Sequence, residues 1–366
     1  MSCNTDLKEY KITISNNSDL VRTSETIEIS LKEISNLLYD SSNEICVLNE
    51  SGKRILSQII DIKTEDGADY LIFQSDFAAG QSKQFTINTK SDDLPMPELS
   101  AKTFCRFVPE RIDDFAWEND RVAFRTYGPV AQKMFENGNP AGLISSGIDC
   151  WLKRVEYPII DKWYKNDQLG KSYHQDHGEG LDNYHVGTTR GCGGSAILEN
   201  GQYIYSENFT SWNIIANGPI RSIFELEYAH NEKKTFTIDL GSNFYHCDVK
   251  YNSEDPIQQA GIGIAHHGSN GEVKLNNNTK ALTYWEAMGD SDLGTAIIID
   301  TKADLSLNND AENNWANVSI TDNSFSYWSG FGWKKAGMFS SYAEWNKYVS
   351  GFSDSKRNPL VIKIKK

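Results

Sequence analysis

The sequence predicts an all-β protein in which antiparallel sheets pack face to face. Short runs of alternating apolar and polar residues recur along the chain, turn residues separate them, and only two short segments read as helices. Alternation with a period of two places every second side chain on one face of a sheet. Many strands with few helices favour sheet-on-sheet packing. The sequence shows no repeat of about 20–50 residues, which argues against a propeller or a solenoid.

The first part of the chain, residues 9–95, is predicted to form a small β-sandwich module. Tyr10, Ile12 and Ile14 alternate with polar residues. Further strands are expected at 25–29, 45–48, 70–73 and 83–87, with turn residues at 49–52 and 65–67. Residues 90–100 contain Pro95 and Pro97 and show no periodicity, so they are predicted to be a linker.

Residues 101–366 are predicted to form the larger domain and to carry the chemistry. Apolar side chains alternate or cluster at 220–228, 236–240, 296–299, 318–320 and 360–365, which predicts strands. The two predicted helices are 129–136, with a proline in its first turn, and 341–350.

Composition excludes several classes of function. The 366 residues include 36 basic and 50 acidic side chains, giving a net charge of −14 with neutral histidines. No basic stripe is present, so nucleic acid is not an expected partner. The sequence lacks the GxxxxGK[ST], GxSxG and HExxH patterns, which argues against common nucleotide-binding, serine-hydrolase and zinc-protease sites. The negative charge repels an anionic glycan at long range, so an acidic substrate would need a locally basic pocket.

The N-terminus begins Met1-Ser2-Cys3. A serine before a near-terminal cysteine is what remains when a lipoprotein signal is trimmed and a start methionine is added. Residues 1–8 are therefore predicted to be a flexible segment after a lipidated cysteine, anchoring a periplasmic or outer-membrane lipoprotein. A chance cysteine is the alternative. The other five cysteines show no CxxC spacing and are expected to be buried apolar residues.

The segment 109–128 combines carboxylates with Arg111, Arg121 and Arg125. One interpretation is a network of ion pairs that braces a strand. The other is a substrate site, in which Arg125 binds a carboxylate through its planar guanidinium and Trp117 is a sugar platform. Core packing of Trp117 is equally favoured. Amides, aromatic faces and charged groups suit sugars, so the predicted substrate-binding set also includes Asn119, Asp149, Trp151 and Arg190.

The segment 173–185 contains two histidines three positions apart, together with glycines and carboxylates. Histidine accepts or donates a proton near neutral pH. Carboxylates orient imidazoles or hold cations, so Asp176 and Asp182 are candidate ligands for a divalent cation. No other cofactor is expected. The alternative is a polar loop whose histidines are merely hydrogen-bonded.

Several of these strings resemble an exported bacterial family described as a domain of unknown function and found in polysaccharide-degradation gene clusters. The resemblance rests on residues 109–127, 146–151, 173–182, 191–194 and 218–221. It covers most of the chain after about residue 100. That family is similar to the galactose-mutarotase-like proteins, so the resemblance implies an antiparallel β-supersandwich for residues 101–366.

A characterised activity in the resembled family is dehydration of ulvan oligosaccharides. The resemblance therefore implies a hydro-lyase that eliminates water from a non-reducing-end glucuronic or iduronic acid and leaves a 4,5-unsaturated uronate. An anionic, ulvan-type oligosaccharide would be its partner.

This elimination needs a base for the C5 proton, an acid for the C4 oxygen and a cation beside the substrate carboxylate. The predicted base is His174 or His177, with Tyr184 second. The predicted acid is the other histidine, Tyr173 or Lys162. Arg125, Arg190 or a bound cation would neutralise the carboxylate. Two alternatives stay open: a glycan-binding protein without turnover, and a hydrolase in which Asp149 and Glu179 flank a glycosidic bond.

Overall fold

The computed structural model describes residues 9–34, 45–62, 69–88, 95, 97–99, 101–268 and 271–365. The prediction of an all-β protein built from antiparallel sheets is confirmed. Cys3, the predicted lipid-anchor site, lies outside the described residues, and the anchor stays a prediction. In the described part of the chain, no helix has the length and apolar character needed to cross a membrane.

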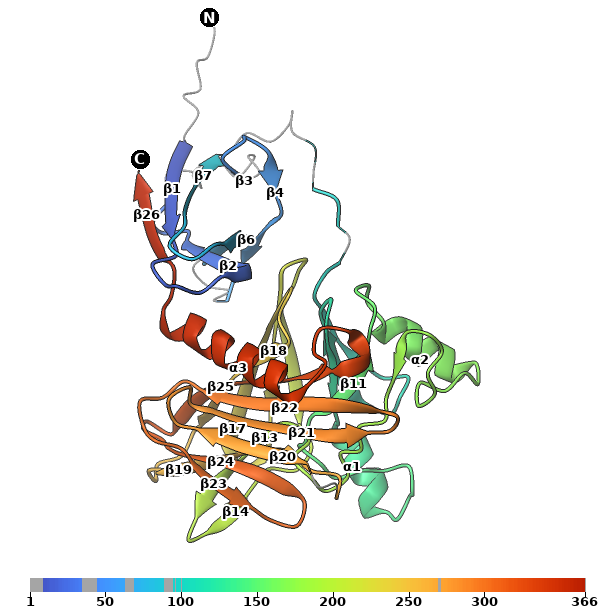
Figure 1. Ribbon diagram of the computed structural model, residues 1–366. Coiled ribbons are helices and arrows are strands. Elements are labelled where there is room, and N and C mark those ends of the chain that lie inside the picture. The colour runs from blue at the N-terminus through green and yellow to red at the C-terminus, as the bar shows by residue number, and fades with distance from the viewer. Residues whose placement is uncertain are drawn as a thin grey trace, which may run out of the picture. The chain divides into compact units, whose positions relative to one another are not determined.

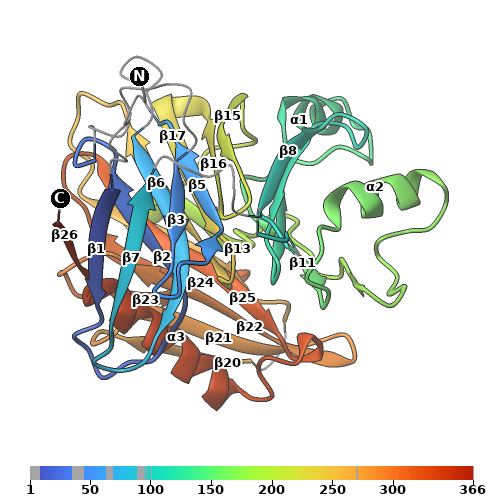
Figure 2. The same ribbon diagram turned by 90° about the horizontal axis from the view of Figure 1, so that it is seen from above.

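The chain divides into two compact units, one comprising 1–100, 218–221 and 354–366, the other comprising 101–217 and 222–353. The first unit holds two antiparallel sheets. One has the order β26 (Val361–Lys365), β1 (Glu9–Ser15), β7 (Ser82–Asn88), β3 (Cys46–Leu48) and β4 (Arg54–Ile55). The other has the order β2 (Arg22–Ser30), β6 (Tyr70–Phe77) and β5 (Ser57–Ile60). Figure 2 shows β1, β7 and β3 side by side.

The last strand belongs to the first unit, which differs from the predicted domain 101–366. Strand β26 pairs antiparallel with β1, so that Ile12 lies opposite Ile364 and Ile14 opposite Ile362. Ile362 and Ile364 pack against the apolar core of this unit. The alternation of apolar and polar residues predicted this strand. It could not identify the strand with which β26 pairs, because that partner lies more than three hundred positions away in the chain.

The second unit holds three antiparallel sheets among its described residues. The largest has the order β15 (Ser211–Asn217), β16 (Arg221–Glu227), β17 (Glu232–Asp239), β18 (Phe244–Tyr251), β25 (Ser324–Trp333), β22 (Ser291–Ile299), β21 (Ala281–Met288) and β20 (Glu272–Asn276). A second has the order β14 (Gln202–Ile204), β13 (Cys192–Glu199), β19 (Gln259–Ala265), β24 (Asn313–Ser319) and β23 (Ser306–Asn309). The third has the order β12 (Gly180–Leu181), β11 (Asp149–Lys153), β10 (Ala123–Thr126), β9 (Asp114–Glu118) and β8 (Phe104–Val108).

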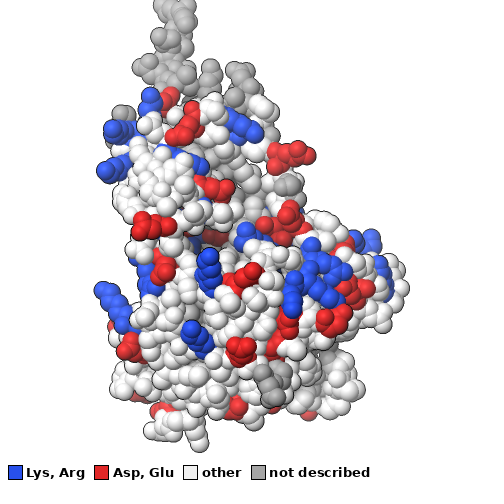
Figure 3. Space-filling model, in the orientation of Figure 1, with Lys and Arg blue, Asp and Glu red and all other residues white. Residues whose placement is uncertain are grey.

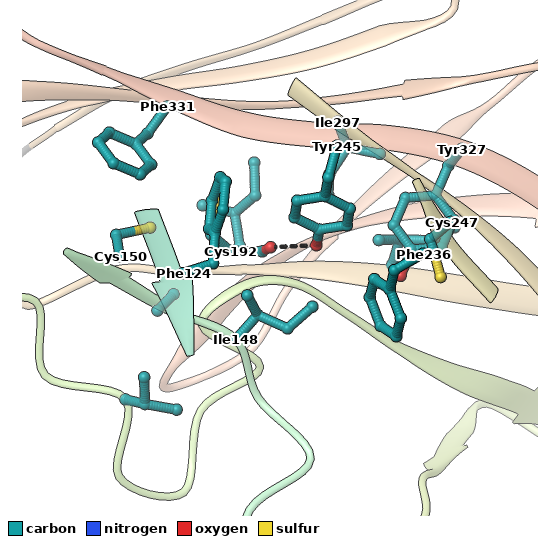
Figure 4. Close-up of a cluster of buried hydrophobic side chains, with 14 of the residues drawn as sticks. Phe124, Ile148, Cys150, Cys192, Phe236, Tyr245, Cys247, Ile297, Tyr327 and Phe331 are labelled. Carbon is teal, nitrogen blue, oxygen red and sulfur yellow. Dashed lines mark hydrogen bonds between the residues drawn. The ribbon is translucent and has the colours of Figure 1, made fainter. Parts of the chain in front are cut away.

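One apolar core is shared by strands from all three sheets. Figure 4 shows its central part, where Phe124, Phe236 and Phe331 lie near Tyr245 and Tyr327. The Tyr245 hydroxyl donates to the carbonyl of Cys192 at 2.6 Å, which pairs the one polar atom of this buried ring. The five described cysteines are buried, as predicted.

The described residues include three α-helices, each of which lies in the second unit or begins there. Helix α1 (Pro129–Glu136) matches its predicted bounds, and α3 (Tyr342–Arg357) continues past the predicted end. Helix α2 (Ile160–Gln168) was not predicted, since it is short and mostly polar. Trp345 and Val349 of α3 pack on Phe244 and Ile298 of the large sheet, along which α3 lies in Figure 1.

Candidate functional site

The site is built on one face of the sheet formed by β9, β10 and β11. Successive side chains of a strand point to opposite faces, so the alternation in DFAWE sends Phe115 and Trp117 into the main core. Asp114 and Glu118 point to the other face. In the neighbouring strands Arg125 lies directly opposite Asp149. The opposite face is therefore a layer of charged side chains, all of them buried.

Arg125 is the centre of this layer. Its Nε and Nη2 donate to Asp149 Oδ2 at 2.9 and 2.6 Å, and Nη2 also donates to Asp182 Oδ2 at 2.8 Å. Its Nη1 donates to the Tyr173 hydroxyl at 3.1 Å and lies 3.5 Å from Asp114 Oδ2. Asp182 and Tyr173 come from the predicted histidine segment, so the structure brings the two predicted clusters into contact.

Aromatic side chains and helix α2 cover the layer. Trp151 packs against Trp163 and Tyr164 of α2 and against Tyr173, with ring centroids 4.8–5.3 Å apart. The Tyr164 hydroxyl donates to Asp114 Oδ2 at 3.0 Å. Because these rings exclude water, the ion pairs beneath them lie in a low-dielectric environment where charges interact strongly.

A second buried ion pair positions α2. Lys153 Nζ lies 2.9 Å from Glu118 Oε2, and both side chains are fully buried. The Glu118 carboxylate accepts the backbone N–H groups of Ile159 and Ile160 at 2.9 Å. A carboxylate at a helix N-terminus accepts hydrogen bonds from unpaired backbone N–H groups and interacts favourably with the positive end of the helix dipole. This pair is therefore structural and fixes the helix that covers the site.

The network holds more carboxyl groups than guanidinium groups. Three aspartates (114, 149 and 182) surround Arg125, and Arg111 adds one further charge through Asp114 at 3.1 Å. Burial raises the pKa of Asp114 to about 6, although Arg125 and Arg111 oppose the shift. Burial and the charge of Asp149 raise the pKa of Asp182 well above its ordinary value. Burial therefore favours the protonated form of both Asp114 and Asp182.

His174 lies at the exposed edge of this network. Its side chain is 60% exposed, and its ring packs on Tyr173 with centroids 4.6 Å apart. Nδ1 lies 2.8 Å from the backbone oxygen of Asp182 and 3.5 Å from the carboxylate Oδ2. Since a carbonyl oxygen only accepts, Nδ1 carries the hydrogen. In the neutral imidazole the lone pair is then on Nε2, where a base would need it.

Three other predicted residues lie on the same surface. His177 is exposed and donates from Nε2 to the Ser172 carbonyl at 3.0 Å. Lys162 is half exposed and forms an ion pair with Glu179, which also binds the hydroxyl of Tyr157. Arg154 donates two hydrogen bonds to the carboxylate of Asp176, at 2.7 and 2.8 Å. Figure 3 shows basic and acidic side chains gathered over the part of the molecule that contains α2.

Of the two interpretations of Trp117, the structure supports core packing rather than a sugar platform, and it also buries Trp151. Trp117 is fully buried and packs against Phe124, Phe224 and Tyr245, because it lies on the core face of β9. Trp151 is 1% exposed under α2. Asn119 is also buried. Its amide donates to the carbonyls of Asp239 and Ser242, and its oxygen accepts two backbone N–H groups, so it stabilises the turn between β9 and β10.

The predicted substrate-binding charges are also buried. Arg125 is 4% exposed, and each of its guanidinium nitrogens has a side-chain partner. Asp149 is its main partner. Arg190 lies elsewhere, with Nη1 donating to Ser146 Oγ at 2.8 Å and its guanidinium 3.8 Å from the Tyr205 ring. None of the three is open to a substrate carboxylate in this arrangement.

The two tyrosines have different positions. Tyr184 is buried in the main core and packs on His267 with centroids 4.8 Å apart. Its side chain is 2% exposed, so its hydroxyl is not open to a substrate in this arrangement. Tyr173 belongs to the site, but its hydroxyl is occupied by Arg125 and its side chain is 6% exposed. Its ring packs against the ring of His174.

The predicted cation ligands are not arranged as ligands. Among the described residues, no group of three or more histidine, cysteine or carboxylate side chains has a geometry that could hold a metal ion. Asp176 is engaged by Arg154 and Asp182 by Arg125. Each of these two carboxylates thus binds an arginine, whereas the prediction had assigned it a divalent metal cation.

The sequence did not identify Arg154 or Tyr157 as residues of the site. Arg154 directly follows β11, and its partner Asp176 is 22 positions away in a loop. Ion pairs across a loop leave no periodic signal in a sequence, whereas the buried charges of the layer do interrupt otherwise apolar strands. Charged residues inside apolar strands were therefore the signal that the sequence offered. They mark the buried layer around Arg125, but not Arg154 or Tyr157.

Fold and site together define a β-sandwich protein with a charged layer under a histidine-bearing loop. The chain belongs to the family described as a domain of unknown function (DUF4861), whose model matches residues 14–362. It is 40% identical over 381 residues to a protein from Formosa agariphila named uncharacterized protein P7, and the match covers 99% of this chain and 95% of that protein.

Two solved structures from Enterococcus faecalis share the fold. One is a protein in glycosyl hydrolase family 38, with a TM-score of 0.54 and 9% identity, covering 98% of this chain and 47% of that chain. The other is an α-mannosidase, with a TM-score of 0.52 and 9% identity, covering 98% and 46%. The chain thus spans about half the length of these proteins, and the likeness shows a common fold.

Proposed function

We propose that this protein is a carbohydrate lyase that removes water from the non-reducing-end glucuronic or iduronic acid of an ulvan-type oligosaccharide. The resemblance of its motifs supports this activity, and the fold shared with glycosyl hydrolase family 38 structures supports a carbohydrate-related role. The observation that carries the proposal is the exposed imidazole of His174, which is oriented by Asp182 so that Nε2 is free to act as a base.

In the proposed reaction His174 takes the C5 proton. The C5–H and C4–O bonds break, a C4=C5 double bond forms, and the C4 oxygen leaves as water after receiving a proton. Each general acid or base contributes about 10²–10⁴-fold to such a step. His174 Nδ1 donates to the backbone oxygen of Asp182 at 2.8 Å, and this carbonyl dipole stabilises the positive charge that develops on the ring.

The other roles fall to exposed groups of the same surface. We assign proton donation to His177 in its imidazolium form, in which Nε2 donates to the Ser172 carbonyl and Nδ1 carries the proton that the C4 oxygen takes. Lys162 is the cation for the substrate carboxylate. Its hydrogen bond with Glu179 raises its pKa, so it stays charged at neutral pH. Arg125 holds Asp182 and Tyr173 in place rather than binding substrate.

A two-carboxylate hydrolase has less support. Such an enzyme needs one carboxylic acid that is protonated at working pH and reaches the glycosidic oxygen. Asp149 is 1% exposed and bound by Arg125. Burial would raise the pKa of Glu179, but hydrogen bonds from Lys162, Tyr157 and Trp163 outweigh burial and lower it. Neither group is suited to donate a proton.

The test is an incubation of the full chain with uronate-ended ulvan oligosaccharides, followed by ultraviolet absorbance and product mass. Dehydration gives rising absorbance and the loss of one water. We expect His174→Ala to reduce kcat by at least about 10²-fold. His185→Ala is the matched control, because His185 is also exposed and its hydrogen bond with His267 uses the backbone oxygen, which the substitution leaves in place.

Each other result has a definite meaning. New reducing ends without absorbance would show hydrolysis, and unchanged sugar that still binds would show a glycan-binding protein. Turnover by His174→Ala within a few-fold of the wild type would contradict the assigned base.

A further inference from the structure

A cleft opens next to the loop that carries His174. Its volume is about 340 Å³, and it is lined by the turn between β9 and β10, the end of β11 and the segment after β25. Trp333 and Phe339 form an apolar wall, and Met338 is 43% exposed beside them. No residue of this cleft was among the predicted site residues.

The charged side chains that line the cleft differ in how many of their hydrogen-bond donors or acceptors are left for a ligand. Lys153 is fully engaged, since its Nζ contacts Glu118, the Asn119 carbonyl and the Tyr157 carbonyl at 2.8–2.9 Å. Asp120 accepts the Gly241 N–H at 2.6 Å, and Glu156 is exposed. Two guanidinium groups, those of Arg121 and Arg154, remain for a ligand.

Arg121 is the less engaged of the two arginines. Its Nε is 4.0 Å from Asp120 Oδ2, the limit of an ion pair, and its Nη1 donates to Asn243 Oδ1 at 3.3 Å. It also interacts with Tyr348. A guanidinium has five N–H donors in a planar fork. Arg121 therefore retains donors for an oxyanion, and its side chain is 21% exposed.

Arg154 connects the cleft to the histidine loop. Its backbone N–H donates to the Glu179 carbonyl at 2.9 Å, and its side chain binds Asp176. Asp176 is two positions from His174, so their Cα atoms are within about 7 Å of each other. Arg154 itself lines the cleft, so its ion pair with Asp176 links the cleft to the loop that carries His174.

We propose that this cleft is the subsite for the sugar that follows the terminal uronate, and that Arg121 binds an anionic substituent of that sugar. The substituent is a carboxylate or a sulfate ester, because both present paired oxygens to a guanidinium fork. The exposed side of Met338 contacts the ring. This assignment deepens the proposed dehydratase function and rests on it.

The experiment measures binding separately from turnover. The full chain carrying His174→Ala is titrated calorimetrically with three glucuronic-acid-ended disaccharides, whose second sugar bears a sulfate ester, a carboxylate or no charge. Adding Arg121→Ala is expected to weaken binding of the charged disaccharides by about 10–100-fold, the loss of a charge-assisted hydrogen bond. Binding of the neutral disaccharide should change less than about two-fold, and Arg121→Lys should restore only part of the loss.

Lys233→Ala is the matched control, since it removes one exposed positive charge, paired with Glu225, at a distant strand. It should leave all three affinities unchanged. Equal weakening of charged and neutral disaccharides by Arg121→Ala, no weakening, or no binding of any disaccharide would overturn the subsite. A charge preference that depends on Arg121 without wild-type turnover would retain the subsite and refute the dehydratase. Preference for sulfate over carboxylate, or the reverse, identifies the substituent.

Discussion

Arg125 and Asp182 are 57 positions apart in the chain, yet Nη2 of the arginine lies 2.8 Å from Oδ2 of the aspartate. The contact joins the strand β10 to the loop that carries His174. Because Arg125 also holds Asp149 on β11, a buried charge fixes the loop to the sheet in addition to the packing of Tyr173 on Trp151. The position of the proposed base therefore depends on the integrity of this ion network.

Removing the central charge should be costly. Arg125→Met leaves Asp114, Asp149 and Asp182 buried without their shared partner. We expect a loss of about 3–5 kcal/mol in the free energy of unfolding near neutral pH, with a smaller loss in acid where the carboxyl groups take up protons. Urea denaturation at several pH values measures both. Lys233→Met, which breaks a partly exposed pair, should cost less than about 1 kcal/mol. Similar losses for both variants would contradict the structural role of Arg125.

Asp114 should make the protein more stable in acid. Its pKa is about 6 in the folded chain, raised by burial, against about 3.9 in the unfolded chain. The folded state binds the proton more tightly, so this contribution is present below about pH 4 and lost as the pH rises to about 6. Its size is about 3 kcal/mol, from 1.36 kcal/mol per pKa unit. The stability of the wild type relative to Asp114→Asn should fall across that range, as measured by urea unfolding. A pH-independent difference would contradict it.

His267 should contribute stability that disappears in alkali. Its Nδ1 lies 2.7 Å from the Glu286 carboxylate and its Nε2 2.9 Å from the His185 carbonyl, so both nitrogens face acceptors. Burial would lower the pKa of His267, but these two partners raise it above its ordinary value. The contribution is complete below about pH 6.5 and is lost as the pH rises through the folded pKa. Thermal denaturation of the wild type and His267→Phe should differ more at about pH 5.5 than at about pH 9.

Two glycines of the histidine loop allow a matched comparison. Gly178 and Gly180 both have positive φ angles, 100° and 129°. A Cβ at Gly178 would meet open space, whereas at Gly180 it would lie 1.9 Å from the Leu152 carbonyl, where β12 pairs with β11. Gly178→Ala should cost about 1–3 kcal/mol from backbone strain. Gly180→Ala should cost at least about 2 kcal/mol more and reduce activity, because the strand pairing must open. Chemical denaturation and the dehydration assay measure both effects, and equal behaviour would show that the β11–β12 pairing does not position the loop.

Local patterns predicted the elements well where a strand has one apolar face. Alternation in residues 10–14 and the proline that begins α1 were sufficient, because both depend on neighbours in the sequence. For Trp117 the sequence left a sugar platform and core packing equally favoured, because which face of a strand is covered depends on segments far away in the chain. In the structure Phe115 and Trp117 lie on the face of β9 that the main core covers, whereas α2 covers the opposite face.

The sequence by itself determined an all-β chain with two charged clusters, because period-two alternation and charges inside apolar strands are properties of adjacent residues. Tertiary structure alone decided that β26 joins β1, that Arg125 is enclosed by three aspartates, and that His174 stays at the surface. Those outcomes depend on contacts between residues far apart in the chain. Burial and ion pairing are set by what packs on each face, and a linear pattern does not contain that information.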